Sequence, residues 1–126
     1  ETKKVYREWG TENILTDSSL YLGKINFYKS GKAGGLQMHQ KKDETFHIIS
    51  GWGWFDYDKG DGKLTRVTIK SGDTIYIPSM AVHRIEAITD LLGIEFSNVV
   101  SDDRRRMEKD YGVEVIGENY GLESTW

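Results

Sequence analysis

Apolar and polar side chains alternate along most of this chain, in short segments separated by glycine-rich turns. Residues 20–29 form the first clear segment of this kind. Segments 45–50, 74–80, 82–88 and 91–98 repeat the pattern, and residues 51–73 are typical of two strands joined by the hairpin DKGDGK. Short strands at regular spacing are the sequence signature of a β-sandwich or barrel, so the pattern predicts an all-β protein.

One segment near the C-terminus departs from the alternation. In SDDRRRMEKDYGV, the residues Ser101, Asp102 and Asp103 predict the N-cap of a short helix, with Arg104–Arg106 in its first turn. Three successive arginines point in three directions around a helix, and acidic residues flank them on both sides. We therefore interpret the segment as a solvated surface helix and not as a phosphate site.

Length, charge and composition narrow the class of protein. The 126 residues suit one domain, residues 1–126, that is long enough to bury a core. A net charge of −3 gives no electrostatic reason to expect nucleic acid or an anionic membrane as a partner. Without cysteine there is no disulfide and no thiolate ligand. No apolar segment resembles a signal peptide or a membrane span, so we expect a cytoplasmic protein.

Four polar residues form a candidate metal site. Gln37 and His39 lie two apart on one predicted strand, so their side chains share a face. Glu44 opens the next strand after a polar turn, and His47 on that strand has the opposite parity. His83 follows far downstream. Imidazole, carboxylate and amide oxygen are ligands that suit divalent ions such as zinc. From the residues alone, both a metal site and an ordinary polar strand edge stay open.

Two longer motifs resemble those of the cupins. The segment from Gly35 through Glu44 to Gly51 resembles the first cupin motif, and GDTIYIPSMAVH, ending at His83, resembles the second. The segments LQMH, KKDET, HRIEA and EKDYG occur in the same order in small cupins related to the C-terminal domain of type II mannose-6-phosphate isomerases. The resemblance covers about residues 8 to 113, which leaves residues 114–126 as a tail.

The resemblance implies a fold and a ligand set. The expected fold is a double-stranded β-helix, the cupin jelly-roll barrel, with a short C-terminal helix. The expected ligands of a divalent metal ion are Gln37, His39, Glu44 and His83. Zinc is the expected metal, with manganese, iron or nickel as alternatives.

The resemblance also implies an activity, namely metal-dependent isomerisation of a sugar phosphate or a related activated sugar. Such a reaction needs a general base, for which Glu95 is the candidate. Lys24, Lys32 and Arg84 are candidates for holding the anionic group of a small-molecule substrate. An ordinary surface charge is the alternative interpretation of each of these residues. A non-catalytic cupin that binds a sugar or small acid and an iron-dependent cupin oxygenase also stay open.

Two departures from the related isomerases concern substrate recognition. Ala33 and Val113 occupy positions where those proteins often have arginine, and arginine is the side chain best suited to bind phosphate in a forked geometry. We therefore expect mannose 6-phosphate itself to be a poor substrate.

The segment GWGWF predicts an interface. Alternation sends Trp52 and Trp54 to one face of their strand and Phe55 to the other, so both faces carry large apolar side chains. A strand of a barrel has only one face toward the core, and exposed apolar patches mark association sites. We therefore expect a homodimer.

Overall fold

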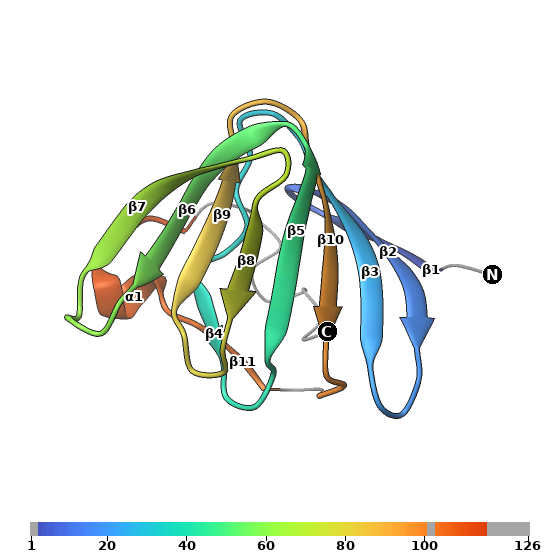
Figure 1. Ribbon diagram of the computed structural model, residues 1–126. Helices are drawn as coiled ribbons and strands as arrows, with labels where there is room; N and C mark the ends of the chain where they lie inside the picture. The colour runs from blue at the N-terminus through green and yellow to red at the C-terminus, as the bar shows by residue number, and fades with distance from the viewer. Residues whose placement is uncertain (1–2, 101–102, 116–126) are drawn as a thin grey trace.

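The computed structural model describes residues 3–100 and 103–115, which form two facing antiparallel sheets (Figure 1). The first five strands are β1 (Lys3–Arg7), β2 (Gly10–Asp17), β3 (Leu22–Tyr28), β4 (Gln37–His39) and β5 (Glu44–Ser50). The next six are β6 (Trp52–Asp58), β7 (Leu64–Lys70), β8 (Thr74–Ile77), β9 (His83–Ala87), β10 (Leu91–Ser97) and β11 (Arg104–Arg106), and α1 (Glu108–Tyr111) follows them.

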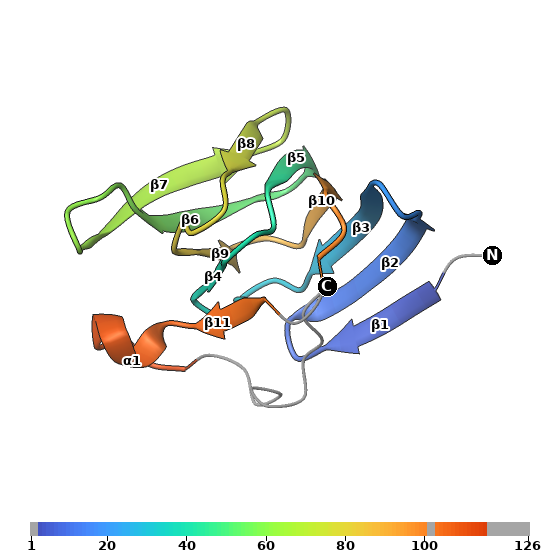
Figure 2. The same cartoon turned by 90° about the horizontal axis from the view of Figure 1, so that it is seen from below.

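The order of the strands is that of a jelly-roll barrel. One sheet has the order β1-β2-β3-β10-β5-β8, and the other has the order β11-β4-β9-β6-β7. Sequence neighbours β4 and β5, like β5 and β6, lie in opposite sheets, so the chain passes repeatedly from one sheet to the other (Figure 2). The all-β, double-stranded β-helix expected from the sequence is confirmed.

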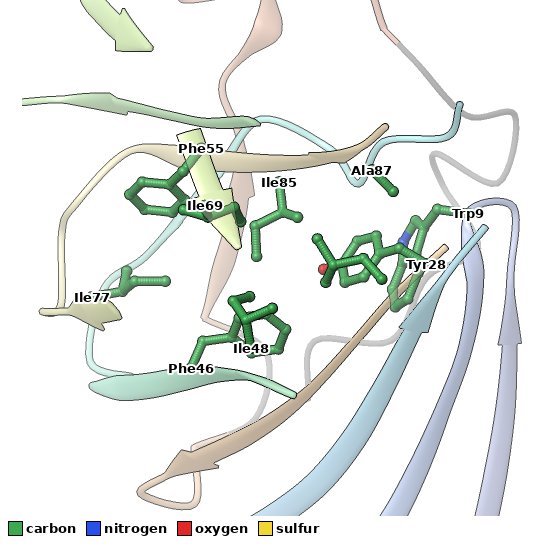
Figure 3. Close-up of a cluster of buried hydrophobic side chains, with 10 residues drawn as sticks. Trp9, Tyr28, Phe46, Ile48, Phe55, Ile69, Ile77, Ile85 and Ala87 are labelled. Atoms are coloured by element: carbon green, nitrogen blue, oxygen red, sulfur yellow. The ribbon is translucent and has the colours of Figure 1, made fainter. Parts of the chain in front are cut away.

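The apolar core fills one part of the space between the sheets (Figure 3). Phe46 and Ile48 enter it from β5, because these residues alternate with outward-facing ones along the strand. Gly93 on the neighbouring strand leaves room for the ring of Phe46, since a Cβ atom there would lie 2.2 Å from the Phe46 Cζ atom. Trp9 stacks on Tyr28 at one end of the core, with ring centroids 4.1 Å apart.

The helix predicted to begin near residue 101 is wrong in its position. Arg104–Arg106 form strand β11, which pairs antiparallel with β4, and the helix begins only at Glu108 (Figure 2). Pairing satisfies the backbone groups along β4, which a three-residue helical turn on the surface could not do. Ser101 and Asp102, the other predicted caps, lie outside the described residues.

The alternation predicted for β6 is confirmed. Phe55 lies in the core, whereas Trp52 is exposed and Trp54 is half-buried on the outer face. Arg66 of β7 lies over the Trp54 ring, 5.3 Å from its centroid. The homodimer expected at this face stays a prediction. Among the described residues, no helix is long and apolar enough to cross a membrane.

Candidate functional site

The interior of the barrel is apolar at one end and ionic at the other. Strand β3 contributes both kinds of side chain, because its buried residues Leu22, Lys24, Asn26 and Tyr28 lie two apart on one face. The burial of charged side chains here needs explanation, since an unpaired buried charge is strongly unfavourable. These charges are paired with one another and surround two adjoining hollows.

The two hollows have volumes of about 50 Å³ and about 40 Å³. The larger one is lined almost entirely by polar atoms, and the smaller one reaches down to the apolar side chains of Phe46, Ile77 and Ile85. Gln37 and Glu44 line both hollows. His39 lines only the larger and His83 only the smaller, so the four expected metal ligands lie around the boundary between them.

Both sheets contribute to this ligand set. Glu44 opens β5 in one sheet, whereas Gln37 and His39 come from β4 and His83 from β9 in the other. Gln37 is the cross-strand partner of His83. The His39 Nε2 atom lies 3.7 Å from the Glu44 Oε2 atom, and the centroids of the two imidazole rings are 6.3 Å apart.

The hydrogen bonds of the two histidines leave the same ring nitrogen available on each. The Nδ1 atom of His39 lies 3.1 Å from the Asp103 Oδ1 atom, and that of His83 lies 3.0 Å from the Ala81 carbonyl oxygen. A histidine whose Nδ1–H donates to an oxygen presents Nε2 as a lone pair, which is the usual arrangement of a metal-ligating imidazole. Burial lowers the pKa of His39 to about 4, and the charge of Lys42 acts in the same direction. Burial also lowers the pKa of His83.

The remaining two donors also fit a divalent ion. The Gln37 Oε1 atom is buried and has no hydrogen-bond partner within the described residues. Burial and the neighbouring charge of Glu95 raise the pKa of Glu44 to about 8. A nearby cation such as a metal ion would therefore stabilise the ionised carboxylate. Two ligands of one ion with bonds of about 2.1 Å lie roughly 3–3.5 Å apart, close to the separation of His39 and Glu44. Within the described ranges, no group of three or more His, Cys, Asp or Glu side chains is arranged so that these residue types alone could hold a metal ion.

Glu95 lies inside the barrel and not on its surface. Its side chain lines both hollows and accepts a hydrogen bond of 3.1 Å from the Asn26 Nδ2 atom. The Glu95 Oε2 atom lies 2.8 Å from Lys42 Nζ and 3.8 Å from Lys24 Nζ. Burial alone would raise the pKa of Glu95, but the two lysines outweigh burial and lower it. Glu95 is therefore ionised at neutral pH.

The three expected substrate-binding residues have different positions. Lys24 lines the larger hollow and forms an ion pair of 2.6 Å with Glu12. Lys32 and Arg84 line neither hollow. Lys32 lies near the surface beside Glu8 at 3.3 Å, and Arg84 faces away from the hollows and pairs with Asp56 at 3.2 Å. Arg84 follows His83 directly in the same strand, so the two side chains lie on opposite faces.

Several residues at the site were not predicted as site residues from the sequence. They are Arg7, Glu12, Asn26, Lys42, Asp103 and Arg104. Glu12 and Asn26 share the inward parity of their strands, and this signal could have identified them. Lys42 belongs to the turn between β4 and β5, where strand parity says nothing about direction.

Asp103 fixes the position of the β4–β5 turn against β11. Its Oδ2 atom accepts hydrogen bonds from the backbone N–H groups of Lys41 and Lys42, and its Oδ1 atom contacts His39. Burial opposes the ionisation of Asp103, but these hydrogen bonds outweigh it and lower the pKa. One carboxylate thus orients His39 and holds the backbone of Lys42.

We expect Asp103→Asn to weaken divalent-metal binding by about 10–100-fold, the usual loss when the partner of a ligand imidazole is replaced. An amide can still accept from the backbone groups, but it cannot match the charge that favours one orientation of His39. Calorimetric titration of each variant with the metal ion measures the effect. Asp43→Asn, in the same turn but paired with Tyr76, is the matched control and should leave the affinity unchanged.

Comparisons with known proteins agree with the fold and the motifs. The family model described as Mannose-6-phosphate isomerase C-terminal matches residues 1–109, and the chain belongs to this family. The mannose-1-phosphate guanylyltransferase of Escherichia coli K12 is 31% identical over 84 residues, which are 67% of this chain and 16% of that protein. The chain therefore spans a small part of this relative.

Solved structures show the same barrel. The capsular polysaccharide assembling protein CapF from Staphylococcus aureus matches with a TM-score of 0.74 and 21% identity, over 84% of this chain and 32% of CapF. Oxalate decarboxylase from Bacillus subtilis matches with a TM-score of 0.74 and 16% identity, over 90% of this chain and 35% of that one. At these identities the likeness shows the fold alone, which is that of a cupin.

Proposed function

We propose that this chain is a metal-dependent cupin isomerase that acts on a small sugar phosphate or a related activated sugar. The observation that supports the proposal is that Gln37 and Glu44 line both adjoining hollows, while His39 lines the larger one and His83 the smaller one. These four side chains would hold a divalent ion, with zinc the first candidate and manganese, iron or nickel as alternatives. We place the reaction in the cytoplasm, with a small molecule as partner and neither nucleic acid nor a membrane.

A bound divalent ion would supply Lewis-acid polarisation of the adjacent carbonyl and hydroxyl oxygens of the sugar. The chain itself must then move a proton between the two neighbouring carbons. Glu95 is the candidate base, because it is ionised and lies at both hollows beside Glu44. Its contacts with Lys24 and Lys42 make it a weak base. A substrate anion that attracts the ammonium group of Lys42 would strengthen it.

The test measures by NMR whether the metal-loaded protein catalyses exchange of the sugar's C2 proton with deuterated solvent. Glu95→Gln should slow exchange by about 10²–10⁴-fold, the usual contribution of a general base. Glu86→Gln is the matched control, because Glu86 is a half-buried carboxylate of the neighbouring sheet that pairs with Arg66 and lines neither hollow. Equal rates for Glu95→Gln and wild type would exclude Glu95 as the base.

One observation favours a second candidate, a non-catalytic cupin that binds a sugar or small acid. Glu95 lies between two ammonium groups, an arrangement that suits a structural ion network better than a strong base. Binding of sugar phosphates without any exchange would favour this alternative. Oxygen consumption by the iron-loaded protein would instead favour an oxygenase. Because Ala33 and Val113 replace arginines of the related isomerases, mannose 6-phosphate should exchange slowly or not at all.

A further inference from the structure

The basic side chains of the site are confined to one of the two hollows. Arg7, Lys24, Lys42 and Arg104 line the larger hollow, whereas no lysine or arginine of the described residues lines the smaller one. These cations come from β1, β3, the β4–β5 turn and β11, which are distant in the sequence. The site therefore has a polarity, with cations on the side of His39 and apolar side chains on the side of His83.

The balance of charges around the larger hollow, once a metal ion is bound, favours an anionic ligand there. Its lining contains the carboxylates of Glu12, Glu44 and Glu95, against the four basic groups. Asp103, which contacts His39 from behind, offsets one further positive charge. The cluster is thus close to neutral by itself and gains about two positive charges with a divalent ion in place. A buried region with excess positive charge attracts and orients small anions.

Arg7 and Arg104 are the side chains best placed to bind an anion. The Nε atom of Arg7 contacts the Glu12 Oε2 atom at 2.6 Å, which orients its guanidinium group at the wall of the hollow. Arg104 lies opposite His39 in the β11–β4 pairing and also lines the hollow. Guanidinium groups bind phosphate and carboxylate through paired N–H donors, so two of them lining one hollow can form an oxyanion anchor.

Asn26 offers a hydrogen-bond acceptor to the hollow, which an anion without a donor group could not satisfy. The side chain is only 4% exposed and lines both hollows, and its Oδ1 atom has no hydrogen-bond partner in the described part of the chain. A buried acceptor without a partner is unfavourable by about 1–3 kcal/mol, which a hydroxyl donor of a ligand would recover. Water can also fill this position, but a hydroxyl group next to the anion satisfies it as part of the ligand.

We propose that the larger hollow binds a small hydroxylated oxyanion, with its phosphate or carboxylate group on Arg7 and Arg104 and a hydroxyl group on Asn26. This orientation directs the rest of the ligand toward Glu44, Glu95 and the boundary with the smaller hollow. The inference names the substrate class of the proposed isomerase and rests on that function for its catalytic meaning. Anion binding itself can be measured whether or not the protein isomerises anything.

Calorimetric titration of the full chain with inorganic phosphate tests the anchor. Arg7→Gln and Arg104→Gln should each weaken binding by at least about tenfold, the loss expected for a hydrogen bond to a charged group. Arg105→Gln is the matched control, because the neighbouring residue of β11 is exposed and lines neither hollow, and it should change the affinity by less than about twofold. A thermal-unfolding scan of each variant verifies that the fold is retained.

The same titrations on chelator-treated protein separate this inference from the proposed function. Phosphate binding that depends on Arg104 in a protein that takes up no metal would support the anchor and contradict the isomerase. Metal binding without phosphate binding, or equal losses in Arg104→Gln and Arg105→Gln, would overturn the anchor alone.

On the metal-free protein glycolate should bind several-fold more tightly than acetate, because only glycolate donates a hydroxyl to Asn26. Equal affinities, or binding of neutral glycerol as tight as that of glycolate, would overturn the assignment of ligand class.

Discussion

His83→Ala should reduce the affinity of the protein for zinc by at least about a hundredfold, whereas His47→Ala should leave it unchanged. A ligand imidazole supplies one of the few bonds that hold the ion, and alanine offers no donor in its place. His83 is 4% exposed, and its Nδ1 atom is fixed by the Ala81 carbonyl oxygen, so only Nε2 remains for an ion. Competition with a chromophoric chelator measures affinities of this strength.

His47 is a suitable control because it lies in β5, the strand that carries the expected ligand Glu44, but its side chain points outward. It lies three residues after Glu44 in β5, with its Nδ1 atom 2.8 Å from the Thr74 hydroxyl oxygen at an exposed position. Equal losses in the two variants would contradict the placement of His47 outside the metal site. Unchanged affinity in both would contradict the metal site and, with it, the proposed isomerase.

Strand parity predicted the parts of the site that lie on regular strands. The rule that residues two apart share a face placed Gln37 with His39, turned Glu44 inward and turned His47 outward. The same rule could have excluded Arg84, since Arg84 and His83 are consecutive and only one of them can face the interior.

Parity could not predict the contributions of turns and of distant chain segments. Lys42 enters the interior from a turn, where no period applies, and its direction is set by hydrogen bonds that the turn's backbone N–H groups donate to Asp103. Asp103 looked like a helix cap in the sequence because aspartate caps helices and no local pattern revealed the free edge of β4. That edge exists only in the folded barrel, where β11 pairs with it.

The ionic interior was difficult to predict for a different reason. A charged residue between apolar ones is more often at the surface than buried, so Glu95 and Lys24 each suggested solvated side chains. Their burial is stabilised by pairing across strands, since Lys24 is the direct cross-strand neighbour of Glu95 and contacts Glu12 on its other side. Such mutual pairing depends on the sheet order β2-β3-β10, which no single segment specifies.

Glu44→Gln should stabilise the metal-free protein at neutral and alkaline pH and abolish its stabilisation by zinc. Burial and the charge of Glu95 raise the pKa of Glu44 to about 8 in the folded chain, above the value near 4.5 of a free glutamate. Folding therefore favours the protonated form. The resulting penalty is absent below about pH 4.5, grows as the pH rises toward 8, and is complete above it. Each pKa unit corresponds to about 1.4 kcal/mol, so the penalty is on the order of a few kcal/mol.

Glutamine removes this penalty because it has no charge to bury, while it keeps a similar volume and an amide oxygen. In urea unfolding of chelator-treated protein, wild type should lose stability between about pH 5 and 8 relative to Glu44→Gln. Added zinc should reverse the ranking at pH 8, because an ion bound only by the folded state stabilises it in proportion to its affinity. Glu86→Gln, outside the hollows, should show neither effect. If Glu44→Gln instead destabilised the metal-free protein at pH 8, the Glu44 carboxylate would already be paired there without an ion, and the proposed metal site would lose its strongest electrostatic support.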